Sequence, residues 1–65
     1  MTEYVYADQQ RLIEFSARPG DTSVMVADKI DHAVNFYPAE QPIQTQADLD
    51  DFAHAWLAQV EPRVL

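Results

Sequence analysis

The chain has 65 residues without a cysteine, and its eleven acidic and four basic residues give a formal net charge of −7. This length allows one domain with a small core, and the lack of cysteine excludes disulfides and thiolate zinc sites. The negative charge disfavours contacts with phosphate backbones and anionic lipids and favours basic partners, although it can serve solubility alone.

The N-terminal third of the chain alternates between side chains of different character, as β-strands do. Residues 3–7 alternate throughout, and in residues 11–18 the apolar side chains fall on the opposite side from the polar ones between them. A turn over residues 8–10 would join these two strands. A second turn is indicated by Pro19, which presets φ, followed by Gly20, which supplies a positive φ. We therefore expect two strands and a turn that leads into a third.

Residues 22–37 fit two different periods. As strands, residues 22–27 and 30–37 form a second hairpin that turns at Asp28 and Lys29. One face of the last strand then carries Ile30, His32, Val34 and Phe36. As one helix, a single face carries Val26, Ile30, Ala33, Val34 and Tyr37. The content of β-branched residues favours the strands.

The helical period is clearest over residues 46–60. Thr45 followed by Asp48 forms a capping box, acidic side chains lie near the positive end of the helix dipole, and Pro62 ends the helix. A connector over residues 39–44 lets this helix fold back over the sheet. The apolar face of the helix carries Leu49, Phe52, Ala53, Trp56, Leu57 and Val60.

These elements predict a single α+β domain over residues 1–65, in which a three- or four-stranded antiparallel β-meander carries one C-terminal amphipathic α-helix on one face. A β-hairpin followed by two helices is the alternative. The first residues lack the pattern of a signal peptide, and the longest apolar run, residues 24–27, is too short to span a membrane. We therefore expect a cytoplasmic location.

No pattern in the chain predicts catalysis, so we expect a protein that is not an enzyme and needs no cofactor. The two serines lack the surroundings of a nucleophile, and one glycine cannot build a phosphate-binding loop. Asp50, Asp51 and His54 could reach one ion, but a site with a single imidazole is weak. We therefore predict no metal site and an ordinary Asp50–His54 pair on the helix surface. His32 is expected to be a half-buried packing residue on its strand.

The aromatic residues exceed what one small core needs. A single helix covers only one face of a sheet, so some of the rings at Tyr4, Tyr6, Phe36 and Tyr37 are expected to lie exposed. Exposed tyrosine and phenylalanine side chains are typical of protein–protein interfaces. The residues reproduce no motif of a known family, so the function has to be inferred from these surface properties.

The sequence therefore predicts a small acidic module that binds another protein with a basic surface and makes no direct contact with nucleic acid or membrane. A sharper version is an inhibitor of the kind that phages and mobile elements carry, which occupies a nucleic-acid-binding surface of a host protein and is released at high salt. The alternative is a structural or assembly protein that works as a homodimer or small oligomer. The residues predicted to contact the partner are Asp48, Asp50, Asp51, Glu3, Glu14, Tyr4, Tyr6 and Tyr37.

Overall fold

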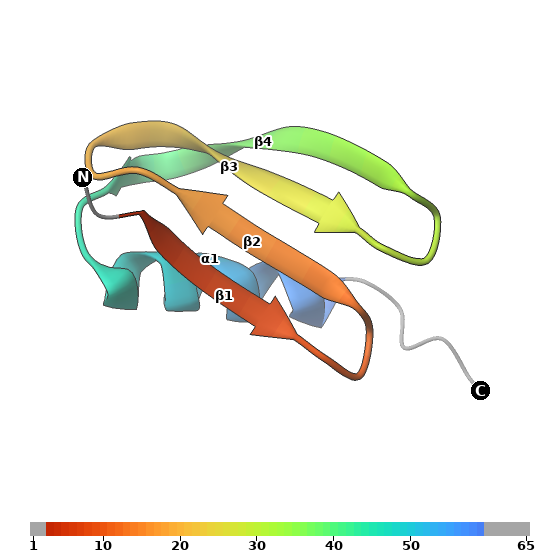
Figure 1. Cartoon of the computed structure of the whole chain (residues 1–65). Coiled ribbons are helices and arrows are strands. Elements are labelled where there is room, and N and C mark those ends of the chain that lie inside the picture. Colours follow the sequence, from red (N-terminus) through yellow and green to blue (C-terminus); the bar gives the residue numbers. More distant parts are fainter. Residues whose placement is uncertain (1–2, 60–65) are drawn as a thin grey trace.

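Within residues 3–59, four strands follow one another along the chain and pair in the same order, which makes the sheet an antiparallel meander (Figure 1). The computed structural model describes residues 3–59 and confirms the predicted α+β class, with one helix packed on the sheet. The alternative with two helices is wrong, because residues 24–37 form strands and their loop. The strands are β1 (Tyr4–Asp8), β2 (Ile13–Ala17), β3 (Asp21–Asp28) and β4 (Ala33–Ile43), and the helix is α1 (Gln46–Gln59).

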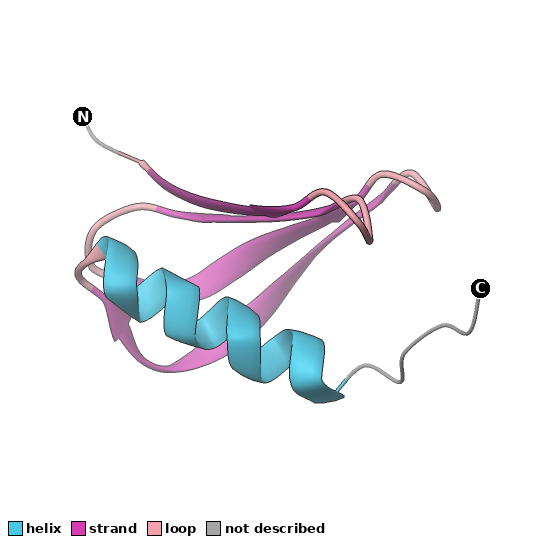
Figure 2. Ribbon diagram, turned by 90° about the horizontal axis from the view of Figure 1, so that it is seen from below, coloured by secondary structure: helices cyan, strands magenta, loops and turns pink. Residues whose placement is uncertain are grey.

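The strand register gathers the buried apolar side chains of the strands on one face of the sheet. Tyr6 lies opposite Phe15, and Phe15 lies opposite Val26, so large side chains line up across three strands. α1 covers this face, which we call the helix face. Nothing within residues 3–59 covers the other face, which we call the open face (Figure 2). The buried apolar core consists of Ile13, Phe15, Ala17, Val24, Val26, Ile43, Leu49 and Ala53.

β4 is longer than the sequence predicts. It runs over residues 33–43 instead of 30–37 and takes in most of the predicted connector, residues 39–44. Pro42 favoured a connector because proline cannot donate to a β-ladder. Within residues 3–59, however, β4 lies at the edge of the sheet and pairs only with β3, and an edge strand tolerates prolines.

α1 begins at a reciprocal capping box, as predicted. The Thr45 hydroxyl accepts a hydrogen bond from the backbone N–H of Asp48 at 3.2 Å. The Asp48 carboxylate in turn accepts hydrogen bonds from the backbone N–H groups of Thr45 at 3.1 Å and Gln44 at 3.0 Å. These bonds satisfy backbone donors at the helix start and fix the direction in which the chain enters α1.

The predicted apolar face of the helix is also confirmed. Of the residues assigned to it, those in the described part of the chain lie buried or half-buried: Leu49, Phe52, Ala53, Trp56 and Leu57. Val60 and Pro62, the predicted end and stop of the helix, lie outside the described residues. No helix within residues 3–59 has both the length and the apolar character needed to cross a lipid bilayer.

The two loops that close hairpins β1–β2 and β3–β4 are built alike. Each is four residues long, which is longer than the predicted turns. The aspartate that ends the first strand, Asp8 or Asp28, accepts the backbone N–H groups two and three residues ahead at 2.9 to 3.2 Å. Each loop ends on a residue with positive φ, Leu12 at 55° and His32 at 53°. The prediction that His32 packs half-buried on a strand is wrong, because this residue lies exposed in the loop.

The capping box predicts a specific loss of stability in the variant Asp48→Ala. Removal of the carboxylate that accepts two backbone N–H groups should lower the free energy of unfolding by about 1–2 kcal/mol. Urea denaturation followed by circular dichroism measures this loss. Asp51→Ala is the control, since it removes a carboxylate near the same helix end and should cost only about 0.3–0.5 kcal/mol. Equal losses in the two variants would contradict the capping role of Asp48.

The positive φ of Leu12 predicts a stabilising substitution. A side chain in this conformation brings its Cβ too close to a backbone oxygen, and glycine relieves the strain. Leu12→Gly should raise the free energy of unfolding by about 0.5–1 kcal/mol, after allowance for the greater freedom of glycine in the unfolded chain. Leu12→Ala keeps the Cβ and should give no gain in the same urea titration. A gain as large with alanine as with glycine would place the cause in the exposed leucine side chain instead.

Candidate functional site

A groove of about 710 Å³ runs between β4 and α1. Two contacts hold α1 toward the opposite edge of the sheet: the side-chain amide of Gln46 donates to the Val5 carbonyl of β1 at 3.0 Å, and Nε2 of His54 lies 3.0 Å from the Tyr6 hydroxyl. The long strand β4 therefore stands beside the helix with a hollow between them. This β4–α1 groove is lined by Tyr37, Pro38, Ala39, Glu40, Gln41, Pro42, Ile43, Asp48, Asp51, Phe52, Ala55, Trp56 and Gln59.

Aromatic side chains form the apolar lining of the groove. The half-buried ring of Trp56 lies edge-to-face against Tyr37 at 5.6 Å and against Phe15 at 5.4 Å between centroids. Phe52 lies in the same wall and packs on Phe15 at 6.4 Å. Because Phe15 is fully buried, these contacts tie the groove to the core. Among residues 3–59 no hydrogen bond from the indole N–H of Trp56 is formed.

Carboxylates line the groove, and no lysine or arginine of the described residues does. Glu40 and Asp51 are exposed, whereas Asp48 is half-buried and already accepts two backbone hydrogen bonds. Glu40 and Asp51 are therefore the two carboxylates left to contact a ligand. Like charges beside an apolar cleft concentrate a potential of one sign there. The groove suits a molecule that combines an apolar body with positive charge.

The acidic residues that the sequence predicts as partner contacts fall in different places. Asp51 lines the groove, and Asp48 reaches it while capping α1. Asp50 accepts a hydrogen bond at 2.8 Å from the side-chain amide of a glutamine in the same helix. Glu3 and Glu14 lie away from the groove, on the side of the open face: the strand register places Glu14 there, and Glu3 lines a hollow together with Met25 and Phe36. The five residues thus do not form one surface, and their part in partner binding stays a prediction.

The three tyrosines of the predicted contact set are half-buried on the helix face. The Tyr4 hydroxyl donates to the backbone carbonyl of Gln44 at 2.9 Å, and the Tyr6 hydroxyl contacts a histidine of α1. Tyr37 lies in the groove against the tryptophan ring. The exposed ring that the sequence anticipates is Phe36, which is 69% exposed on the open face. Of the tyrosines, Tyr37 is the one placed to meet a ligand in the groove.

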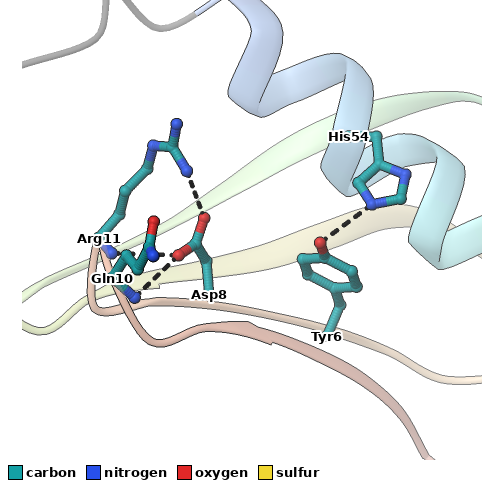
Figure 3. A network of polar contacts seen from close by, with 5 residues as sticks. All are labelled: Tyr6, Asp8, Gln10, Arg11 and His54. Atoms are coloured by element: carbon teal, nitrogen blue, oxygen red, sulfur yellow. Dashed lines mark hydrogen bonds and ion pairs between the residues drawn. The ribbon is translucent and has the colours of Figure 1, made fainter.

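His54 does not pair with Asp50 as the sequence predicts. Its ring instead contacts Tyr6, both through the hydroxyl and edge-to-face at 5.2 Å, and joins α1 to β1 (Figure 3). No group of three histidine, aspartate or glutamate side chains within residues 3–59 could hold a metal ion. The histidine therefore has a structural contact that spacing along one helix could not reveal.

The carboxylate of Asp8 accepts hydrogen bonds from the loop that follows β1 (Figure 3). The backbone N–H of Arg11 and then its guanidinium, 2.6 Å from the carboxylate, donate hydrogen bonds that lower the pKa of Asp8, and these outweigh its partial desolvation. The backbone N–H of Gln10 adds a third bond. This charge is committed to closing the β1–β2 hairpin.

The lowered pKa of Asp8 predicts how stability depends on pH. The carboxyl of the unfolded chain has a pKa of 3.8, so the contribution of Asp8 to stability is complete above that pH and is lost as the pH falls through the lower pKa of the folded state. Asp8→Asn keeps the shape of the side chain without the charge and should be less stable than the wild type at neutral pH. The difference in urea midpoint between the two proteins should shrink between about pH 5 and about pH 2. A difference that stays constant over this range would contradict the assignment.

Sequence reasoning did not single out the groove. The sequence places Phe52 and Trp56 in the core and Glu40 in a connector. In the structure, both rings are half-buried and contact the core with only part of their surface. One signal was available: Asp48 lies four positions, about one helical turn, before Phe52, and a second carboxylate, Asp51, lies in the same turn of the helix. The position of β4 beside these residues depends on the tertiary fold.

Comparison of the chain with protein-family models, with curated proteins and with solved structures finds no significant match. Its function therefore has to be inferred from the molecule itself. Two features provide a basis: the β4–α1 groove and the open face of the sheet.

Proposed function

We propose that this protein is a small non-catalytic interaction module that binds a basic, extended segment of another protein in the β4–α1 groove. One observation carries the proposal: the groove joins the aromatic lining at Trp56 to the exposed carboxylates of Glu40 and Asp51, and no basic side chain of residues 3–59 lines it. Its volume of about 710 Å³ is within the range of sites that hold ligands of drug size, and is enough for a few side chains of a peptide.

Arginine and lysine side chains complement this lining. A guanidinium can stack on the ring of Trp56 and pair with the carboxylate of Asp51, and an ammonium can do the same with less geometric match. An ion pair at an exposed carboxylate contributes little by itself, so an apolar side chain against the aromatic rings has to supply much of the affinity. The charges then steer the partner and set its specificity.

The backbone of β4 has a smaller part in recognition. Its outer edge is unpaired within residues 3–59, and such an edge can accept a further strand. Pro38 and Pro42 nevertheless remove two backbone N–H donors from the stretch that lines the groove. A continuous added strand is therefore disfavoured, and we infer that the segment is recognised mainly through its side chains.

The first experiment uses Trp56, the only tryptophan of the chain, as a reporter inside the groove. The probe is a synthetic peptide of alternating arginine and leucine, and the comparison peptide replaces arginine by glutamate. Titration with the Arg–Leu peptide should change the tryptophan emission saturably, and the affinity should fall by about tenfold when NaCl is raised from about 0.05 M to about 0.5 M. A response equal for both peptides, or none to the Arg–Leu peptide, would refute the proposed function.

Charge-neutralising variants test whether the groove itself attracts the peptide. Asp51→Asn and Glu40→Gln should each weaken binding of the Arg–Leu peptide about two- to fivefold, as expected for exposed ion pairs. Glu3→Gln is the matched control, because it removes the same charge on the side of the open face. If Glu3→Gln weakens binding as much as Asp51→Asn, the attraction comes from the net charge and not from the groove.

The acidic inhibitor predicted from the sequence is a finer form of the same proposal. A basic segment that fits the groove is chemically the kind of segment that binds phosphate backbones, so the module would compete with nucleic acid for its partner. In the matching assay, the protein should displace a labelled oligonucleotide from the Arg–Leu peptide, and Asp51→Asn should do so less effectively. Failure to displace would argue against inhibition while leaving peptide binding intact.

A further inference from the structure

The open face carries side chains in rows that cross all four strands. The central row consists of Val5, Ser16, Met25 and Phe36. The next row consists of Ala7, Glu14, Ala27 and Val34. Phe36, Val34 and Val5 are 69%, 58% and 46% exposed, although each stands among other apolar residues. A gathered apolar patch of this kind marks an interaction surface, unlike single apolar residues scattered over a protein.

The charges beside the open face are nearly balanced. Nζ of Lys29 lies 3.8 Å from the carboxylate of Glu14. At the other end of the face, a shallow hollow of about 240 Å³ is lined by Glu3, Arg18 and Asp21. Two of the four basic residues of the chain therefore lie beside this face, although the whole chain carries −7. The excess of negative charge lies elsewhere on the molecule.

We propose that the open face binds a second copy of this chain, so that two sheets pack face to face about a two-fold axis. Aligned sheets pack about 10 Å apart through apolar side chains such as Phe36, Val34 and Met25. The same patch meets itself in such an interface, so it has to be self-complementary in charge, and a nearly neutral face satisfies this condition. A basic partner protein is attracted by the carboxylates of the β4–α1 groove, and the nearly neutral open face offers no comparable attraction.

The size of the face sets the expected strength. Four strands about 4.8 Å apart, with five or more residues rising about 3.3 Å each, give a face of roughly 20 by 20 Å. Two such faces bury on the order of 800–1,200 Å² in total, which is at the low end for specific interfaces. We therefore expect a dimer that dissociates in the micromolar range.

The dimer leaves the proposed binding grooves free. α1 lies on the far side of each sheet from the open face, so both β4–α1 grooves remain on the outside of the pair (Figure 2). Two grooves on one particle could bind two segments of one partner and gain from effective concentration. The inference of a dimer does not depend on the proposed function, since a different face and different residues carry it.

Sedimentation equilibrium of the wild type over protein concentrations from about 1 μM to about 1 mM tests the inference. The weight-average mass should rise toward twice that of the chain, and Phe36→Gln should raise the dissociation constant at least about tenfold. Val34→Gln, in the neighbouring row, should act in the same direction, and circular dichroism checks that both variants fold. A mass that stays that of one chain over the whole range would overturn the proposal.

The matched control is Ile30→Gln, which makes the same kind of change at an apolar residue that is 50% exposed in the β3–β4 loop. It should leave the dissociation constant within about twofold, and equal weakening by Ile30→Gln and Phe36→Gln would show non-specific association and refute the interface. Higher salt should preserve or strengthen the dimer, because it screens the repulsion between two negative chains. Phe36→Gln should keep the Trp56 response to the Arg–Leu peptide, so failure of one proposal is separable from failure of the other.

Discussion

A four-stranded sheet has two faces, and within residues 3–59 one helix of 14 residues is available to cover them. α1 can bury only one face, so the large apolar side chains that point to the other face stay accessible. Phe15 becomes the centre of the core because it lies on the covered side, fully buried, whereas Phe36 is 69% exposed because it lies on the other. The two candidate binding surfaces, the β4–α1 groove and the open face, both exist because one helix cannot cover the whole sheet.

The position of the helix on its face decides the second surface. Contacts from Gln46 to β1 and between His54 and Tyr6 draw α1 toward the β1 edge. β4, which is the longest strand, is then left with part of its length uncovered next to Trp56. The groove therefore exists because these contacts hold the helix away from β4. The rings of Phe52 and Trp56 contact the core on one side and line the groove on the other.

The acidic side chains of this protein have different roles. Asp8, Asp28 and Asp48 each accept backbone N–H groups at a loop or helix start, and Asp21 accepts one from Arg18 at 2.9 Å. Such bonds stabilise turns and caps because they satisfy donors that secondary structure leaves unpaired. These carboxylates keep their charge, but their oxygens are already hydrogen-bonded within the chain. The carboxylates of the groove matter because of where they lie and not because of their number.

Local patterns in the sequence were enough to indicate the order of the strands and the helix, although not the extent of β4. The 3.6-residue period and the pair Thr45 and Asp48 define α1 and its start. Alternation indicates the first two strands, and β-branched residues favour strands over residues 22–37, where a helical period also fits. These signals are local because periodicity and capping depend on neighbours within a few residues. The α+β class follows from the order of such elements.

The tertiary structure alone decided which side chains meet. The sequence could not show that β4 continues through Pro38 and Pro42, because proline is acceptable only at an edge and the edge is known only once the strands pair. It could not place Tyr6 against His54, 48 positions apart in the chain. The groove and the open face depend on register and on the side that the helix covers. A shift of one residue in register would exchange the two faces of a strand, so long-range packing, and not local pattern, decides where this protein can bind.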